Sequence, residues 1–267
     1  MTEITNSSAR RIVSLVPSMT ETVFSLGAGD RVVGVTRFCV HPKEARERAR
    51  IVGGTKNPTI DKILTLEPDL VLANQEENRR EDVERLREHA PVHLAFPRSV
   101  TEAIADIRTL GSLLGKAEQA ASMAAEMEAA RLATRRVAPS FRYLYFIWRK
   151  PYMLAGPDTF IEAFLAEAGG VNAAPRGQGR YPEVGVDEIR DSGADVFLLS
   201  SEPFPFREDH RRRLAADLGV DEGQLARIHL VDGELLSWHG ARLREGIPYL
   251  GSLAASLTTG KGRRPPG

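Results

Sequence analysis

The sequence lacks several features on which common functional classes depend. Its 267 residues include one cysteine, Cys39, which excludes an intrachain disulfide and a cysteine-rich metal cluster. Lys and Arg together number 36, as do Asp and Glu, so the formal net charge is zero. A neutral chain argues against nucleic acid or an acidic membrane surface as partners. No apolar run approaches the roughly 18 residues of a membrane-spanning helix, so membrane insertion is not expected.

An export signal is also missing from the N-terminal segment. The apolar stretch at residues 12–16 ends at Pro17, and a secretory signal needs an apolar run of roughly 7–15 residues. As written, the chain is expected to be soluble, unexported and monomeric.

Familiar catalytic signatures are absent as well. The sequence contains no Walker-type phosphate loop, no G-x-G-x-x-G, no G-x-S-x-G and no H-E-x-x-H. The six histidines never stand four residues apart on one predicted helix, so no dedicated zinc site is expected. These absences favour a binding protein with no catalytic residue, no metal site and no cofactor of its own.

What the chain does contain is a regular alternation of short apolar runs and segments with helical periodicity. Strands are predicted at residues 12–16, 32–35, 69–73, 92–95, 142–148, 195–200 and 229–231, and helices at 18–27, 59–66, 79–89, 99–115, 158–168, 207–218 and 241–257. The capping-box pattern that begins at Ser18 predicts that the first helix starts there. This alternation predicts an α/β fold with parallel sheets covered by helices on both faces.

One segment breaks the alternation. Residues 116–138 contain neither Gly nor Pro, which predicts a single helix about 33 Å long. The expected organisation is two Rossmann-like lobes, at residues 10–115 and 139–259, joined by one long rigid helix at 116–138. Because a helix without Gly or Pro is a poor hinge, we expect little closure on ligand binding.

The two lobes share a short internal repeat. Ile-Asp-Lys-Ile at residues 60–63 precedes Pro-Asp-Leu-Val-Leu at 68–72, and Val-Asp-Glu-Ile at 186–189 precedes Ala-Asp-Val-Phe-Leu at 194–198. Two similar lobes that face each other would form a cleft suited to a ligand. Two βα units can also resemble each other without a common function, because acids at helix starts follow the helix dipole.

Aromatic residues make up only 6% of the chain, yet many fall between predicted elements. In an open α/β sheet the ligand crevice lies at the carboxyl ends of the strands, so these rings are candidates for an apolar cleft, although each alone could plug the end of a core. They are Phe38, Trp148, Tyr152, Tyr181, Phe204, Phe206 and Trp238. His41 and His239 lie in the same loops and are candidates either to ligate a bound ligand's metal ion or to hydrogen-bond backbone.

Three segments in combination resemble the class III substrate-binding proteins of ABC importers. They are RIVSLVPSMTE at residues 11–21, VGVT at 33–36 and LEPDLVLA at 66–73, and the resemblance extends over about residues 10–257. It implies two lobes on a helical backbone, an extracytoplasmic location and delivery of a ligand to an ABC permease. The implied ligand is a metal chelate: a cobalamin-like corrinoid, haem or a ferric siderophore.

The resemblance also implies roles for individual residues. Asp61 and Asp187 would dock on permease arginines, at positions where family members usually carry Glu. Phe38 and Tyr181 would pack on the macrocycle, and Pro17 and Ser18 are counted with the ligand-binding residues. Thr55 stands where cobalamin receptors carry a third ring.

Two other functions remain open at this point. A cytoplasmic corrinoid or haem carrier without a permease would fit the missing export signal. A chelatase-like metal-handling enzyme would use a cleft histidine together with an acid such as Glu183 as proton acceptor.

Overall fold

The computed structural model describes residues 8–135, 140–220 and 224–259, and the chain divides into two compact units. Unit 1 takes in Met1–Pro97, Thr101–Glu128 and His239–Arg244, and unit 2 takes in Arg98–Val100, Ala129–Trp238 and Glu245–Gly267. These bounds differ from the expected lobes in two ways. The division falls inside the long helix, and a segment near the C-terminus belongs to unit 1.

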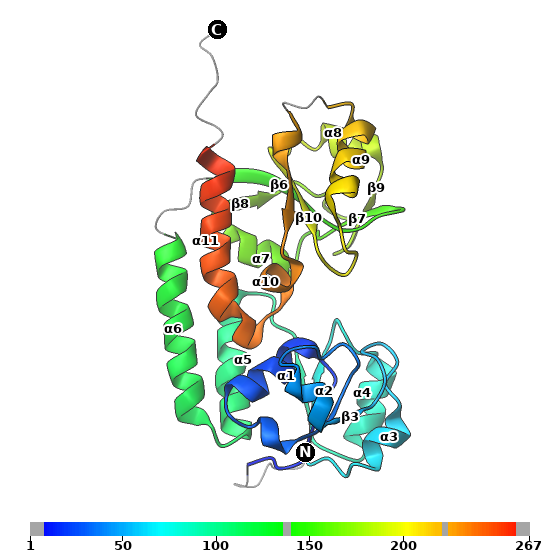
Figure 1. Cartoon of the computed structure of the whole chain (residues 1–267), viewed down its shortest axis with the longest axis vertical. Helices are drawn as coiled ribbons and strands as arrows, with labels where there is room; N and C mark the ends of the chain where they lie inside the picture. Colours follow the sequence, from blue (N-terminus) through cyan, green and yellow to red (C-terminus); the bar gives the residue numbers. More distant parts are fainter. Residues whose placement is uncertain (1–7, 136–139, 221–223, 260–267) are drawn as a thin grey trace. The chain divides into compact units, whose positions relative to one another are not determined.

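Unit 1 is built on a parallel five-stranded sheet with the order β3-β2-β1-β4-β5. Its strands are β1 (Ile12–Ser14), β2 (Val32–Val35), β3 (Arg50–Ile51), β4 (Leu70–Asn74) and β5 (Val92–Ala95). Its helices are α1 (Pro17–Ser25), η1 (Gly29–Arg31), α2 (Glu44–Arg48), α3 (Ile60–Leu64), α4 (Arg80–Arg87), α5 (Val100–Leu113) and η3 (Gly240–Arg242) (Figure 1). Because β2 and β4 flank β1 on opposite sides, the winding of the chain reverses at β1, which is where open α/β sheets bind ligands.

Helices cover this sheet because each buries an apolar stripe against it. Ile60, Ile63 and Leu86 of α3 and α4 belong to one buried cluster with Val13 and Val71 of the sheet. Successive strand residues point to opposite faces of a sheet. The residues on either side of Val13 are also buried, and they face the helices on the opposite side of the sheet from α3 and α4. In Figure 1, α3 and α4 lie on one side of the sheet and α1 and α5 on the other.

The first helix starts differently from the prediction. Pro17 is its first residue, where a fixed φ and a missing N–H suit a helix N-terminus, and the N-cap residue Val16 offers no side-chain acceptor. Ser18 is buried inside the first turn. The capping-box prediction at Ser18 was therefore wrong, because the proline sets the start of the helix.

Unit 2 contains a mixed six-stranded sheet with the order β11-β10-β6-β7-β9 and with β8 paired to β6. Its strands are β6 (Phe141–Trp148), β7 (Tyr152–Leu154), β8 (Gly170–Asn172), β9 (Glu183–Val184), β10 (Val196–Ser200) and β11 (Ile228–Val231). Its helices are α7 (Phe160–Ala166), α8 (Val186–Asp191), α9 (Glu208–Leu218), η2 (Gln224–Arg227) and α10 (Gly233–Ser237). The expectation of parallel sheets holds in unit 1 but not here, since β7 runs antiparallel to both β6 and β9. A turn at residues 149–151 reverses the chain directly after β6.

Two long helices contribute to both units. They are α6 (Ala117–Arg135) and α11 (Leu243–Thr259). The helix predicted over 116–138 is confirmed as far as Arg135, and residues 136–138 lie outside the described residues.

The internal repeat recurs as the same hydrogen-bonded corner in each unit. The carboxylate of Asp69, just before β4, accepts from the backbone N–H of Arg11 at 2.8 Å, and Asp195, just before β10, accepts from the N–H of Arg142 at 2.8 Å. Each aspartate returns its own N–H to the carbonyl of that arginine, at 3.0 and 2.8 Å. Each guanidinium also donates to a carbonyl of the loop before the strand. The same helix-loop-strand module is therefore bonded to the start of the central strand in each unit.

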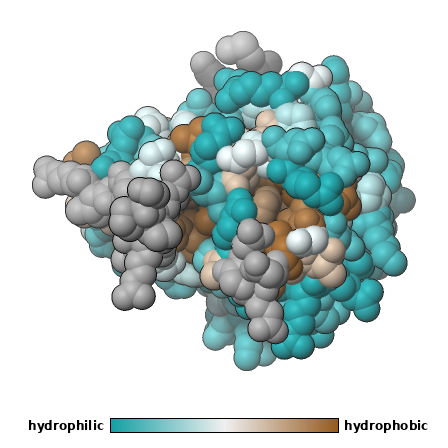
Figure 2. Space-filling model, turned by 90° about the horizontal axis from the view of Figure 1, so that it is seen from above, coloured by the Kyte–Doolittle hydropathy of each residue, from teal (hydrophilic) through white to brown (hydrophobic). Residues whose placement is uncertain are grey.

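The surface agrees with a composition that is 27% charged. Figure 2 shows a face that is mostly hydrophilic, with hydrophobic residues gathered in an area framed by hydrophilic ones. Within the described ranges, the structure has no helix that is both long enough and apolar enough to cross a membrane.

Candidate functional site

The most prominent aromatic side chain of unit 1 lies in the loop that follows β2. Phe38 is 53% exposed, although burial of such a large ring is strongly favourable. The guanidinium of Arg37 lies 5.9 Å from the centroid of the ring. This loop leaves the carboxyl end of a strand beside β1, which is the edge at which open α/β sheets bind ligands.

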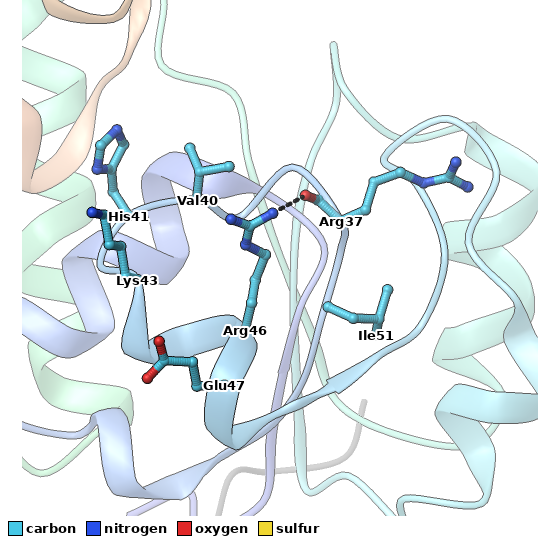
Figure 3. A pocket seen from close by; sticks show the side chains of 7 residues that line it. All are labelled: Arg37, Val40, His41, Lys43, Arg46, Glu47 and Ile51. Carbon is cyan, nitrogen blue, oxygen red and sulfur yellow. Dashed lines mark hydrogen bonds between the residues drawn. The ribbon is translucent and has the colours of Figure 1, made fainter.

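A hollow of about 520 Å³ adjoins the Phe38 loop (Figure 3). It is lined by the loop, by α2 and its N-terminal neighbour, and by β3, through Arg37, Val40, His41, Lys43, Arg46, Glu47 and Ile51. His41, a predicted ligand residue, is therefore one wall of a basic hollow in unit 1. Arg46 reaches back across it and donates to the carbonyl of Arg37 at 3.4 Å.

The start of the Phe38 loop is fixed by a buried polar network. The hydroxyl of Thr20 lies 2.8 Å from Oγ of Ser14 and 3.1 Å from Sγ of Cys39, and Thr36 contacts the same sulfur at 3.3 Å. Burial raises the pKa of the Cys39 thiol. The thiol therefore stays protonated and inside, which gives Cys39 a packing role.

His239 lies in unit 1 although its sequence neighbours on the N-terminal side belong to unit 2. Asn74, the last residue of β4, accepts the backbone N–H of Glu76 on Oδ1 at 2.8 Å. Its amide nitrogen therefore faces Nε2 of His239, 3.1 Å away, and that ring nitrogen is the acceptor. The histidine is only 8% exposed, and burial lowers its pKa. Its Nε2, one of the two nitrogens a metal ion could use, is thus already engaged by a neutral partner.

Polar contacts also hold the residues that follow His239. The N–H of Ala241 donates to Oγ1 of Thr22 at 2.9 Å, and Arg242 pairs with Glu21 at 3.0 Å. Gly240 has φ 81°, and a Cβ there would lie 2.2 Å from the Thr22 hydroxyl, so only glycine fits. Sequence reasoning placed no contact here, because the partners are more than 200 residues apart and carry no local motif.

In unit 2, aromatic rings gather at the carboxyl ends of β6 and β10. Trp148 is 41% exposed, and its ring centroid lies 5.6 Å from that of Phe204, which in turn lies 4.8 Å from Phe206. Phe206 is 6% exposed and belongs to the hydrophobic core of unit 2. Phe206 therefore packs in the core, which was the alternative role predicted for each ring. Its burial anchors the loop beneath Phe204.

The remaining predicted rings of unit 2 differ in their hydrogen-bond partners and in their exposure. The hydroxyl of Tyr152 donates to Asp217 at 2.8 Å. The indole N–H of Trp238 donates to Glu202 at 2.6 Å. Tyr181 is 38% exposed, with the guanidinium of Arg180 5.8 Å from its ring centroid. Phe38, Trp148 and Tyr181 are therefore the rings that offer most surface.

Thr55 is placed in the interior and not on a surface. Its side chain is buried, and its carbonyl accepts from the amide of Asn78 at 2.9 Å. The position predicted to lack a third ring therefore presents a small, buried residue.

The two acids of the internal repeat are exposed and occupy matching places. Asp61 lies in the first turn of α3 and Asp187 in the first turn of α8. Each contacts one arginine, Arg85 at 2.9 Å and Arg190 at 2.5 Å. Exposed ion pairs of this kind contribute little stability, so both carboxylates can exchange partners at small cost.

The residues that the structure describes do not form a metal-binding cluster. Among them no three His, Cys, Asp or Glu side chains come together as a set of metal ligands.

Comparison with known proteins gives a family match that covers most of the chain. A family described as periplasmic binding protein matches residues 12–218. The cobalamin-binding protein of Halobacterium salinarum is 33% identical over 201 residues, which is 72% of this chain but only 54% of that protein. The periplasmic vitamin B12 binding protein of Vibrio cholerae superposes with a TM-score of 0.81 at 21% identity, covering 96% of this chain and 99% of the other. The periplasmic heme-binding protein of Roseiflexus sp. RS-1 superposes with a TM-score of 0.78 at 26% identity, covering 95% and 99%.

Proposed function

The chain belongs to the periplasmic binding protein family, as a class III substrate-binding protein of ABC importers, and we propose that it captures a flat, metal-containing macrocycle for import. As a member of this family it is a binding protein and not an enzyme, so the chelatase-like alternative is set aside. A cobalamin-like corrinoid is the first candidate ligand, and haem or a ferric chelate is the second.

The observation that carries this proposal is the exposure of three aromatic rings, two in loops and one at the end of a strand. Phe38 of unit 1 and Trp148 and Tyr181 of unit 2 leave between 38% and 53% of their surface in contact with water. Aromatic rings bind flat π-systems and apolar surfaces through stacking and edge contacts. The names of the relatives support a macrocycle of the cobalamin or haem type.

Delivery to a permease is the second part of the proposal. Asp61 and Asp187 are exposed, lie in matching helix starts and already contact arginines of the same chain. Arginine side chains of a permease would take the places of Arg85 and Arg190 and bind the same two carboxylates through charge-assisted hydrogen bonds. This role requires an extracytoplasmic location, which the family also favours.

The test of ligand capture is retention of a chromophore. The purified protein is incubated separately with cyanocobalamin, cobinamide, haemin and a ferric hydroxamate, desalted, and its visible spectrum recorded. We expect stoichiometric retention of one class and loss of most of it in the Phe38→Ala/Trp148→Ala variant. Glu81→Ala, an exposed change on α4, is the matched control. Retention of none of the four would contradict the proposal.

A further inference from the structure

The basic hollow beside Phe38 has a composition that the flat-ligand proposal does not explain. Arg37, Lys43 and Arg46 all line it, and the one acid in its lining is Glu47. Figure 3 shows the Arg46 side chain in the middle of the group, with Lys43 beside His41 on one side and, on the other, the Arg37 side chain extending away from the group. An open surface hollow that gathers like charges raises the local concentration of anions.

Among the described residues these three cations have no carboxylate within ion-pair distance, although Glu47 lines the same hollow. The hydrogen bond of Arg46 to a backbone carbonyl is long, at 3.4 Å. Other arginines of unit 1 are paired, such as Arg85 with Asp61 and Arg242 with Glu21. The hollow therefore keeps donors available for an acceptor that is not part of the chain.

The position of the hollow connects those donors to the ring. Arg37 both lines the hollow and lies 5.9 Å from the centroid of Phe38. A flat ligand resting on Phe38 would bring the substituents at its edge to this guanidinium. Val40 and Ile51 supply apolar walls, and Ile51 is itself exposed. An alkyl carboxylate of a ligand would fit this hollow, with its methylene groups against the apolar walls and its carboxylate next to Arg46 and Lys43. Arginine binds carboxylates with paired hydrogen bonds.

We propose that this hollow is an anion subsite that binds carboxylate side chains at the rim of the macrocycle. The inference rests on the proposed function and reverses its order of candidates, because it places macrocycles with peripheral carboxylates, such as haem, ahead of fully amidated corrinoids such as cobalamin. A free small anion, such as inorganic phosphate or citrate, shares the same chemistry and is separated from the macrocycle by the test.

The test compares two corrinoids that share a ring and a metal. Dicyanocobyrinic acid carries carboxylate side chains, and dicyanocobinamide carries amides in their place. Binding of each is measured by titration calorimetry and by retained absorbance, for the full chain and for the Lys43→Gln/Arg46→Gln variant. Arg48→Gln, on the same helix but outside the hollow, is the matched control, and Arg37→Gln is a second, independent probe of the hollow.

We expect the full chain to bind the acid at least tenfold more tightly than the amide. The double variant should lose at least tenfold affinity for the acid and less than twofold for the amide, and added salt should weaken binding of the acid. Equal affinity for both corrinoids, or equal losses for both in the variant, would overturn the inference and leave the proposed function standing. Saturable binding of phosphate or citrate alone, with no preference for the acid, would also overturn it. If neither corrinoid binds and neither haemin nor the ferric hydroxamate is retained, the proposed function fails together with the inference.

Discussion

The amide of Asn74 donates a hydrogen bond to Nε2 of His239 across 165 positions of sequence. The bond fixes the orientation of the imidazole ring and also its protonation state, because a protonated imidazole has no acceptor nitrogen. The contact between β4 and the segment that begins at His239 therefore depends on the neutral form of the histidine.

Acid should weaken the protein through this histidine. Burial lowers the pKa of His239 in the fold below the ordinary value of 6.5, with His93 acting in the same direction and Asp106 and Glu76 opposing it. Below about pH 6.5 the unfolded chain binds more protons than the folded chain, so stability falls as the pH drops toward the lower folded pKa. We expect Tm to decrease between pH 7.5 and pH 5, and less steeply in His239→Gln. Because the pKa of His229 is also lowered, the Tm of the variant should still depend on pH. Identical pH profiles for the two proteins would contradict this assignment.

Substitution of two phenylalanines should affect ligand affinity in one case and stability in the other. Phe38→Ala removes an exposed ring and should lower ligand affinity about tenfold, which corresponds to about 1.4 kcal/mol, with little change in Tm. Phe206→Ala removes a buried ring and should destabilise unit 2 by about 3 kcal/mol. Thermal unfolding and spectroscopic titration of both variants check the pair. Loss of stability in Phe38→Ala comparable to that in Phe206→Ala would show that the exposed ring is structural.

The repeated corner predicts matched losses in the two units. Asp69→Ala and Asp195→Ala each remove a carboxylate that accepts a backbone N–H at the edge of a central strand. Each should cost about 1 kcal/mol. Hydrogen exchange should show the loss in the unit that carries the change, with the other unit unaffected. Exchange that increases equally in both units would rule out independent corners.

We expect permease docking, but not ligand binding, to depend on the carboxylates of Asp61 and Asp187. Asp61→Ala/Asp187→Ala should retain ligand affinity and lose stimulation of a reconstituted permease's ATPase. The exposed pairs with Arg85 and Arg190 contribute little to stability, so Tm should remain the same. Asp191→Ala, at the other end of α8, is the control. Full stimulation by the double variant would show that docking does not depend on these two carboxylates, whereas no stimulation by the unmodified protein would favour a carrier that works without a permease.

Much of the fold could be predicted because its signals are local. The apolar runs at 32–35 and 92–95 are strands at those residues, and the segment without Gly or Pro after residue 116 is helical. The strands β7 and β9 were missed because they are only two or three residues long. β7 pairs with β6 around a turn that no apolar pattern marks, and β9 pairs with β7 from a separate part of the chain.

The candidate site was predictable by residue type but not by environment. Loop position identified Phe38, Trp148 and Tyr181 as well as Phe206, and only the packing separates the exposed rings from the buried one. The unpaired cations around Arg46 were missed because they come from a loop and a five-residue helix with no motif spacing. Long-range partners such as Asn74 and His239 leave no local signal at all.

The segment His239–Arg244 has a consequence for how the protein is made. Unit 1 begins at the N-terminus but includes these residues, which supply partners to Asn74, Thr22 and Glu21. During synthesis, most of unit 2 must leave the ribosome before unit 1 can complete its contacts. A nascent chain stopped before residue 239 would lack the residues that bond to Asn74, Thr22 and Glu21, so the contacts of unit 1 are completed only when the C-terminal part of the chain has been made.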